Sequence, residues 1–545
     1  MARTGGQLVV DALVANAVTQ AFCVPGESFL PILDALHDTS SIRLTVARQE
    51  GGAAMMAEAH AKLTGRPGIC LVTRGPGAAN AYAGVHVAAQ DSTPMIVLVG
   101  QIATGDMDRE AFQEIDVKAM FGDQVKWAAQ VNETGRLPEY LARAFSLAQS
   151  GRPGPVVLAL PEDMLSGTAE TVAAPASAPV HAHPSPAGMD RFGAMLRAAE
   201  RPLLIAGGPG WDAGLVDRFV AFAERWALPV SCAFRAQDRF PNTHPNYAGD
   251  AGLGINPALA ERIGRSDLVI ALGARLGDCT TSGYTLFDSP VPKQPVVHIH
   301  PEPDELGHVY RPTLPIAASV AAFIEAAGAL DAPADPVWAD WTNQANAAYR
   351  AWSDAATPMP GAVNWGEAVI WLRENLPADA ILTNGAGNYA VWLHRFYRHR
   401  AYRTQLAPTS GSMGYGLPAA IAAKLAAPDR TVIALAGDGC LQMTVQELGT
   451  LAEADLAIIV LVVNNSMYGT IRMHQEMHYP GRVSGTSLVN PDFVALARAY
   501  GLKGERVETT GQFGPAMQRA LAADKATLIE IVTDPRGLSP TRVME

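Results

Sequence analysis

Short, wholly apolar segments recur along the chain, and each is followed by Gly or Pro and then by a longer helical pattern. These segments are 69–72, 95–99, 156–160, 203–206, 268–272, 432–435 and 458–463. Strands that are apolar on both faces are typical of parallel sheets covered by helices on each side. The sequence therefore predicts an α/β fold of parallel sheets flanked by helices.

The length of the chain, 545 residues, is too great for one hydrophobic core and predicts about three domains. Two stretches interrupt the strand and helix patterns. The first is rich in Ala, Pro, Ser and Thr, and in the second Pro is frequent and strand signals are absent. We therefore expect an N-terminal domain over 1–165, a linker over 166–186, a middle domain over 187–330, a linker over 331–359 and a C-terminal domain over 360–545.

The composition excludes several classes of protein. The chain is 48% apolar and 17% charged, which is globular, and its formal net charge of −12 comes without a basic patch for nucleic acid. The longest apolar run, Leu456 to Val463, is far shorter than the roughly 18–20 residues of a membrane helix. The first residues lack a signal-peptide pattern, and five single cysteines favour reduced thiols. We expect a cytoplasmic protein that binds neither nucleic acid nor membranes.

Two polar motifs end neighbouring apolar runs near the C-terminus. Asp438, between Gly437 and Gly439, and Asn465, the second of an Asn-Asn pair, are separated by one strand–helix–strand unit. In a parallel sheet both would lie at the same edge, so their oxygens and the Met467 carbonyl can converge on Mg²⁺, with diphosphate oxygens completing its shell. The two glycines let the backbone approach the phosphates. Each motif alone could be a simple turn, but the pair at this spacing is specific.

This pair is the thiamine diphosphate motif, and the chain resembles thiamine-diphosphate-dependent decarboxylases and carboligases over essentially its whole length. The resemblance is strongest to acetolactate (acetohydroxyacid) synthase catalytic subunits, whose pattern the segments 51–101 and 111–114 follow. It implies a pyrimidine-binding N-terminal domain, a diphosphate-binding C-terminal domain, and thiamine diphosphate and Mg²⁺ as cofactors.

The resemblance also assigns catalytic residues. In this family a Glu at the end of a strand bonds N1′ of the aminopyrimidine, and Glu50 stands at that position. Without the metal motif, Glu50 would be read as a carboxylate favoured by a helix N-terminus. The resemblance places Phe112 and Gln113 near the reacting carbon. Ser28 lies in a loop that often contacts substrate, although it could equally be the N-cap of the next helix.

Further segments resemble the walls of the cofactor site. The resemblance places Met413 between the two rings of the bent cofactor and makes the Gly411 carbonyl an acceptor for the 4′-amino group. Gly387 and Asn388 resemble contacts to the diphosphate, although Asn388 could be an ordinary turn residue. The whole set expected to contact the cofactor is Gly387, Asn388, Gly411, Met413, Gly437, Asp438, Gly439, Asn465, Met467, Tyr468 and Gly469.

Two positions depart from the synthase pattern. Cys279 stands where the synthases carry an Arg that pairs with the second oxo acid, and His474 stands where they carry a Trp beside the second substrate. A thiol cannot replace a bidentate guanidinium, so these changes favour another acceptor. His474 is either a proton donor or acceptor in the site or a surface residue.

The expected reaction is decarboxylation of a 2-oxo acid followed by ligation to a carbonyl acceptor. The alternatives are a lyase that splits a 2-hydroxy ketone or α-diketone, as benzaldehyde lyase does, and a simple 2-oxo acid decarboxylase. A paralogue without activity is disfavoured because Glu50, Asp438 and Asn465 are intact.

Two further expectations follow from the resemblance. The stretch 207–210 and Arg275 are compatible with a nucleotide, so FAD in the middle domain stays open. In this family the first domain of one subunit faces the third domain of another. We therefore expect a homodimer or a dimer of dimers with active sites between chains.

Overall fold

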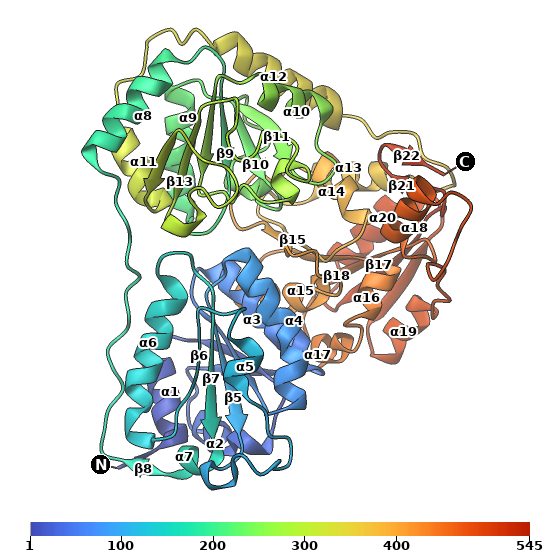
Figure 1. Ribbon diagram of the computed structural model, residues 1–545. Coiled ribbons are helices and arrows are strands. Elements are labelled where there is room, and N and C mark those ends of the chain that lie inside the picture. The colour runs from blue at the N-terminus through green and yellow to red at the C-terminus, as the bar shows by residue number, and fades with distance from the viewer. Residues whose placement is uncertain (1, 545) are drawn as a thin grey trace. The chain divides into compact units, whose positions relative to one another are not determined.

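Three six-stranded sheets form the framework of the chain in the computed structural model, which describes residues 2–544 (Figure 1). Their strand orders are β3-β2-β4-β5-β7-β6, β11-β10-β9-β12-β13-β14 and β16-β15-β17-β18-β20-β19. Every strand pairing inside these sheets is parallel. The predicted fold class, α/β with parallel sheets flanked by helices, is confirmed.

The chain divides into two compact units. The first contains the residues up to Val180 together with 417–428 and 444–456, and the second contains the rest. Two pieces of the C-terminal third of the sequence therefore pack with the N-terminal sheet. They hold most of α15 (Gly416–Ala426) and all of α17 (Glu447–Glu453).

The first unit is built on the sheet of β2 (Gln20–Cys23), β3 (Arg43–Val46), β4 (Gly68–Val72), β5 (Met95–Gln101), β6 (Trp127–Gln130) and β7 (Pro155–Pro161). One face of the sheet forms a core with α1 (Gly5–Ala15), α2 (Leu30–His37), α6 (Leu137–Gln149) and α7 (Glu162–Ser166). Across the sheet from α1 and α6 lie α3 (Glu50–Thr64) and α4 (Pro76–Asp91), as Figure 1 shows. The short strands β1 (Arg3–Thr4) and β8 (Thr168–Ala169) pair antiparallel, and α5 (Val117–Phe121) precedes β6.

The middle sheet contains β9 (Pro202–Ala206), β10 (Val230–Ala233), β11 (Tyr247–Ala251), β12 (Leu268–Leu272), β13 (Val296–His300) and β14 (Leu314–Ala317). Alternate strand residues enter two separate cores, as the period of two in a strand requires. One core includes α8 (Pro186–Ala198), α9 (Ala213–Arg225) and α11 (Val320–Gly328), and the other includes α10 (Pro257–Arg265). Within the stretch predicted as the second linker, α12 (Ala339–Ser353) packs against β11.

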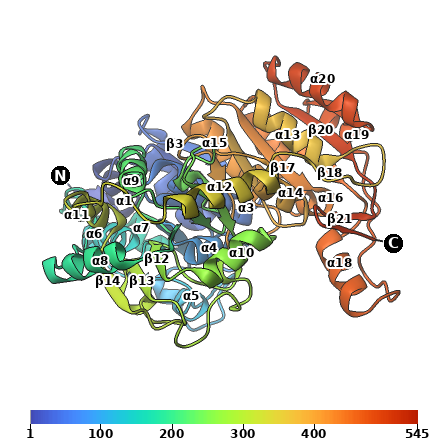
Figure 2. The same ribbon diagram turned by 90° about the horizontal axis from the view of Figure 1, so that it is seen from above.

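The C-terminal sheet contains β15 (Ile381–Asn384), β16 (Gln405–Leu406), β17 (Val432–Gly437), β18 (Ile459–Asn464), β19 (Lys503–Val507) and β20 (Thr527–Val532). Its helices are α13 (Trp365–Asn375), α14 (Tyr389–Phe396), α16 (Asp438–Gln442), α18 (Gly469–His478), α19 (Phe493–Ala499) and α20 (Thr510–Leu521). The hairpin of β21 (Gly537–Ser539) and β22 (Arg542–Val543) follows. Figure 2 shows α18 projecting from the rest of this domain. Because β17 pairs with both β15 and β18, the carboxyl ends of these three strands lie side by side.

Two further features bear on the sequence analysis. No helix among residues 2–544 is both long and apolar enough to cross a membrane. All five cysteines are free thiols, and four of them are buried.

Candidate active site

A cavity of about 280 Å³ opens where β15, β17 and β18 end. Its wall includes the segments 386–389, 437–440 and 467–471, and all eleven residues predicted to contact the cofactor line it. These residues come from four separate stretches of the sequence. The parallel sheet brings them together because successive strands deliver their following loops to the same edge.

Oxygen ligands for a hard cation lie at this edge. Asp438 is the first residue of α16 and is almost completely buried, and burial raises the pKa of its carboxyl group. Asn490 Nδ2 donates to Asp438 Oδ2 at 2.7 Å and to Asn464 Oδ1 at 3.0 Å. Asn465 Oδ1 accepts the N–H of Met467 at 3.3 Å. A carboxylate, an amide oxygen and a main-chain carbonyl suit Mg²⁺, so the donor set fits the predicted metal.

The glycines of this edge serve packing as well as access. A Cβ at Gly439 would lie 2.7 Å from the ring of Tyr468 and 3.1 Å from Leu488, and one at Gly437 would lie 3.1 Å from Tyr389. The distance at Gly439 is shorter than real Cβ contacts, so this position needs glycine for steric reasons, whereas a Cβ at Gly437 would require only a small shift of Tyr389. Gly411 differs, because a Cβ there would meet nothing within 4 Å and its φ of +68° is what requires glycine.

Tyr389 and Cys440 connect the loops behind the cavity. The Tyr389 hydroxyl accepts the N–H of Gly385 at 3.0 Å and lies 3.5 Å from Cys440 Sγ. Cys440 Sγ in turn accepts the N–H of Gly414 at 3.2 Å. Burial raises the pKa of Tyr389 well above its usual value, so its hydroxyl stays protonated and can donate to the Leu435 carbonyl at 3.3 Å.

Asn388 links three parts of the cavity wall. Its Nδ2 donates to the Leu538 carbonyl in the C-terminal hairpin at 2.6 Å, and its Oδ1 accepts from Thr470 Oγ1 on α18 at 3.0 Å. The side chain is therefore more than a turn residue. It joins the loop after β15 to two segments that follow it by more than eighty positions.

Glu50 lies in the first unit as the first residue of α3. Gln49 is the N-cap, and its Oε1 accepts the N–H of Gly51 at 2.6 Å and of Gly52 at 3.2 Å. Asn80 Nδ2 donates to Glu50 Oε2 at 2.9 Å. The Gln49 side chain therefore accepts N–H groups at the start of the helix, so the Glu50 carboxylate is not needed for that purpose. It lies beside α4, where Asn80 is its side-chain partner.

The turn before Glu50 is held by a second buried carboxylate, Glu447 at the start of α17. Both oxygens of Glu447 lie 3.2 Å from the backbone nitrogen of Arg48, which donates to them, and Thr450 Oγ1 donates to Oε2 at 2.7 Å. Burial raises the pKa of Glu447. A Cβ at Gly52 would lie 2.5 Å from Glu447 Oε1, so the glycine makes room for this carboxylate.

The loop after β4 gathers the other residues predicted to lie near the substrate. Ser28 is fully buried, and its Oγ lies 2.8 Å from Thr73 Oγ1. Ser28 does not cap α2, whose N-cap is Phe29. Arg74 Nε donates to the Phe112 carbonyl at 3.1 Å, while the Phe112 side chain is 74% exposed and available to another surface.

The same loop reaches Gln113, and the first turn of α4, which follows it, reaches Glu50. Gln113 has a φ of +64°, and its carbonyl would lie 2.7 Å from a Cβ at Gly75. A Cβ at Gly77 would lie 3.3 Å from Glu50 Oε1. The structure therefore brings Ser28, Phe112, Gln113 and Glu50 around one loop of the first unit.

Comparisons with known proteins show the family to which the chain belongs. Three family models match: the N-terminal TPP-binding domain of thiamine pyrophosphate enzymes over 3–120, the central domain over 189–327 and the C-terminal TPP-binding domain over 385–531. The chain is 32% identical to the acetolactate synthase large subunit of Corynebacterium glutamicum, over 97% of this chain and 86% of that protein. It is 31% identical to the large subunit of acetolactate synthase isozyme 2 of Escherichia coli K12, over 99% of each. The chain belongs to the thiamine pyrophosphate enzyme family.

In this thiamine pyrophosphate enzyme, whose cofactor is also called thiamine diphosphate, the two positions that depart from the synthase pattern lie outside the cavity wall. His474 is exposed on α18, and its ring stacks on that of His478 at 6.1 Å between centroids. Cys279 begins a short 3-10 helix of the middle domain, and burial raises the pKa of its thiol. Neither residue is among those that line the cavity.

Sequence reasoning missed several residues that contact the candidate site residues of the two units. Asn490 lies in a loop without a motif, and Glu447 lies in a helix that reads as ordinary. Tyr389 and Cys440 directly follow predicted residues, and that adjacency was the only signal for them.

Proposed function

We propose that this enzyme decarboxylates a 2-oxo acid and ligates the remaining acyl carbon to a carbonyl acceptor, using thiamine diphosphate and Mg²⁺. The observation that carries the proposal is the convergence of all eleven predicted cofactor residues on one cavity. The relatives named acetolactate synthase support a carboligase over a simple decarboxylase or a lyase. Bound thiamine diphosphate supplies the electron sink that lets a carboxylate leave from a carbon next to a carbonyl.

The residues of the cavity divide between the metal and the organic cofactor. Asp438, Asn465 and the Met467 carbonyl would hold Mg²⁺. Gly411 and Met413 would meet the two rings. The residues that would surround the diphosphate are Gly387, Asn388, Gly437, Gly439, Tyr468 and Gly469.

The metal assignment is tested with Asp438→Ala. The variant should lose Mg²⁺-dependent retention of thiamine diphosphate, whereas Asp524→Ala, which alters an exposed carboxylate of the same domain, should bind normally. Calorimetry that gives Asp438→Ala the wild-type affinity would remove this residue from the metal site.

Glu50 would hold a proton at N1′ of the aminopyrimidine, and Phe112, Gln113 and Ser28 would lie beside the substrate. Glu50→Gln should keep cofactor binding and lose most turnover, because the amide cannot share that proton. Glu139→Gln, at an exposed carboxylate of the same unit, is the matched control. Near-normal turnover of Glu50→Gln would exclude Glu50 from the mechanism.

We further propose a homodimer, or a dimer of dimers, with each active site built from two chains. Glu50 belongs to one compact unit and the diphosphate residues to the other. Large apolar side chains that a partner subunit could cover are exposed on both units, among them Leu30 and Phe112 on the first and Ile471 and Tyr479 on the second.

Subunit mixing tests this assembly. A dimer of one Glu50→Gln subunit and one Asp438→Ala subunit would have one doubly altered site and one intact site, so part of the activity should return. Demonstrated subunit exchange without recovered activity would mean that each site lies within one chain.

The acceptor is best sought outside the 2-oxo acids, because Cys279 replaces the guanidinium that would pair with a second carboxylate. A panel of 2-oxo acid donors with aldehydes and ketones as acceptors, followed for CO₂ release and product, identifies both substrates. Ligation without CO₂ release would instead indicate a 2-hydroxy ketone lyase acting in reverse.

Two remaining proposals concern flavin and location. Gly207 and Gly208 are required by packing, since a Cβ at Gly208 would lie 1.8 Å from the Gly273 carbonyl, and Arg275 pairs with Glu305 at 3.0 Å. These residues therefore give no independent support for FAD, and the absorption spectrum of the purified enzyme decides whether FAD is bound.

The free cysteines favour a reducing compartment, and we propose the cytoplasm.

A further inference from the structure

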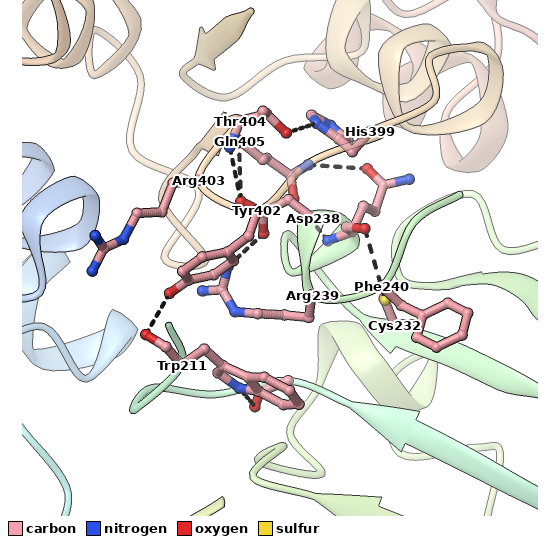
Figure 3. Close-up of polar contacts among 12 residues, drawn as sticks. Trp211, Cys232, Asp238, Arg239, Phe240, His399, Tyr402, Arg403, Thr404 and Gln405 are labelled. Carbon is pink, nitrogen blue, oxygen red and sulfur yellow. Dashed lines mark hydrogen bonds and ion pairs between the residues drawn. The ribbon is translucent and has the colours of Figure 1, made fainter. Parts of the chain in front are cut away.

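A row of buried polar side chains follows β10 in the middle domain and bonds to the C-terminal domain. We call this stretch, residues 235–242, the polar seam. Its Asp238 carboxylate accepts the backbone N–H groups of Thr404 at 3.1 Å and Gln405 at 3.3 Å. Figure 3 shows Asp238 directed toward these two residues, with the Tyr402 hydroxyl donating to the Trp211 carbonyl nearby. The seam therefore binds the main chain of the other domain directly.

Arg235 begins the seam and reaches the loops behind the cavity. Its side chain is almost entirely buried, and its Nη2 donates to the Gly385 carbonyl at 2.7 Å. Its Nη1 donates to the Pro408 carbonyl. Gly385 directly precedes the cavity segment 386–389, and Pro408 stands three residues before Gly411. One guanidinium thus bonds to both loops that deliver cavity residues from the β15 and β16 side of the sheet.

We propose that Arg235 is a positioning residue for the cofactor, which it does not touch: it fixes the separation of these two loops. The proposal rests on the cofactor site described above. A guanidinium is planar and its donors form a rigid fork, so two carbonyls bonded to it are held at a set spacing. None of the cavity-lining residues comes from 187–330, yet through Arg235 the middle domain contributes to the affinity of the site.

The backbone of Arg235 supports a side-chain role. Its φ is +57°, a conformation that costs free energy for any residue except glycine. If the position served only the chain path, glycine would be the better residue. The structure keeps a strained arginine there, and its guanidinium is what glycine would lack.

This reasoning makes Arg235→Gly a sharp test. The substitution relieves the backbone strain, which offsets part of the cost of removing both hydrogen bonds, so the melting temperature of the cofactor-free protein should fall no further than that of Asp238→Asn. The dissociation constant for thiamine diphosphate with saturating Mg²⁺, measured by calorimetry, should rise about tenfold, because the two loops are no longer held at the bound spacing and must be ordered when the cofactor binds. Arg235→Lys supplies one point charge for two carbonyls. Its dissociation constant for thiamine diphosphate should lie between those of the wild type and Arg235→Gly.

Two controls separate positioning from general stability. Asp238→Asn weakens the same seam at Thr404 and Gln405, which do not line the cavity, so it should lower the melting temperature and leave the dissociation constant within about twofold. Methylguanidinium should restore part of the affinity of Arg235→Gly and leave the wild type unchanged. An Arg235→Gly protein with wild-type affinity overturns the proposal. A wild-type protein that does not bind thiamine diphosphate would instead overturn the proposed function.

Discussion

Replacement of Glu447 tests whether a residue of α17 controls the geometry of Glu50. The Glu447 carboxylate accepts the Arg48 N–H at 3.2 Å, and Glu50 follows Arg48 by two positions. Glu447 is completely buried, so no solvent compensates for its loss. We expect Glu447→Gln to keep the shape of the side chain and to weaken the contact that fixes the turn.

The expected magnitude follows from the two donors to this carboxylate, the Arg48 N–H and the Thr450 hydroxyl. Glu447→Gln retains one acceptor oxygen, so the free energy of unfolding should fall by about 1 kcal/mol, whereas Glu447→Ala loses every acceptor and leaves a cavity, at about 2–4 kcal/mol. A displaced Glu50 carboxylate should lower kcat about 10- to 100-fold, because reacting groups must be aligned closely. The dissociation constant for thiamine diphosphate should not change, since the diphosphate residues lie in the other unit.

Three measurements decide between a positioning role and a structural one: urea unfolding, cofactor calorimetry and kcat. Thr450→Val is the matched control, because it removes the hydroxyl that donates to Glu447 at 2.7 Å and leaves the carboxylate on the Arg48 N–H. The control should lose stability with little change in kcat. A Glu447→Gln enzyme that is less stable but has the wild-type kcat would refute the reasoning.

The pH dependence of stability supplies a second check on Glu447. Burial raises the pKa of Glu447 in the folded chain, so the folded state binds its proton more tightly than the unfolded state. The resulting stability is fully present below the unfolded pKa, about 4.3, and is lost as the pH rises through the higher folded value. Glu447→Gln has no titrating group at this position. Its free energy of unfolding, relative to that of the wild type, should therefore increase as the pH rises from about 4.3 through the folded pKa of Glu447.

Three further predictions concern single side chains. Gly439→Ala should weaken cofactor binding and destabilise the fold by about 1–3 kcal/mol, because the new Cβ would overlap Tyr468 at 2.7 Å; calorimetry and urea unfolding check both effects. Asn490→Ala should raise the Mg²⁺ concentration needed for half-maximal cofactor binding about tenfold, because Asp438 loses its 2.7 Å donor; a Mg²⁺ titration with unchanged midpoint would contradict this. Phe112→Ala should alter the free energy of unfolding by less than about 0.5 kcal/mol, since the ring is 74% exposed, yet raise KM if it lies at the substrate.

The features that the sequence predicted well are local ones. Each apolar run forms a buried parallel strand. A strand that is covered on both faces has apolar residues at successive positions, and this pattern is visible in the sequence. The metal motif placed Asp438 and Asn465 at one cavity because each follows its strand directly, and strand pairing then fixes their neighbourhood. The family resemblance placed Ser28 and Phe112 near the substrate, and nothing in the sequence indicated that both lie around the loop after β4.

The features that the sequence did not reveal depend on contacts between distant segments. The Asn490 donor to Asp438 comes from a loop 52 positions away, and the Arg48 N–H is bonded by Glu447 almost 400 positions later. The predicted linker over 331–359 contains α12, whose Trp341 Nε1 donates to the Pro202 carbonyl at 3.0 Å. A helix that is stabilised mainly by such tertiary bonds has a weak signal in its own sequence.

The three carboxylates of interest share one local design. Glu50, Asp438 and Glu447 are each the first residue of a helix, a position that favours the anion. Burial nevertheless raises the pKa of Asp438 and of Glu447, so in both cases desolvation outweighs the hydrogen bonds that the carboxylate accepts. The charged form of each group then depends on specific donors from elsewhere in the chain. For Asp438 and Glu447, local sequence therefore sets the position of the carboxylate, and burial by distant segments sets the direction of its pKa shift.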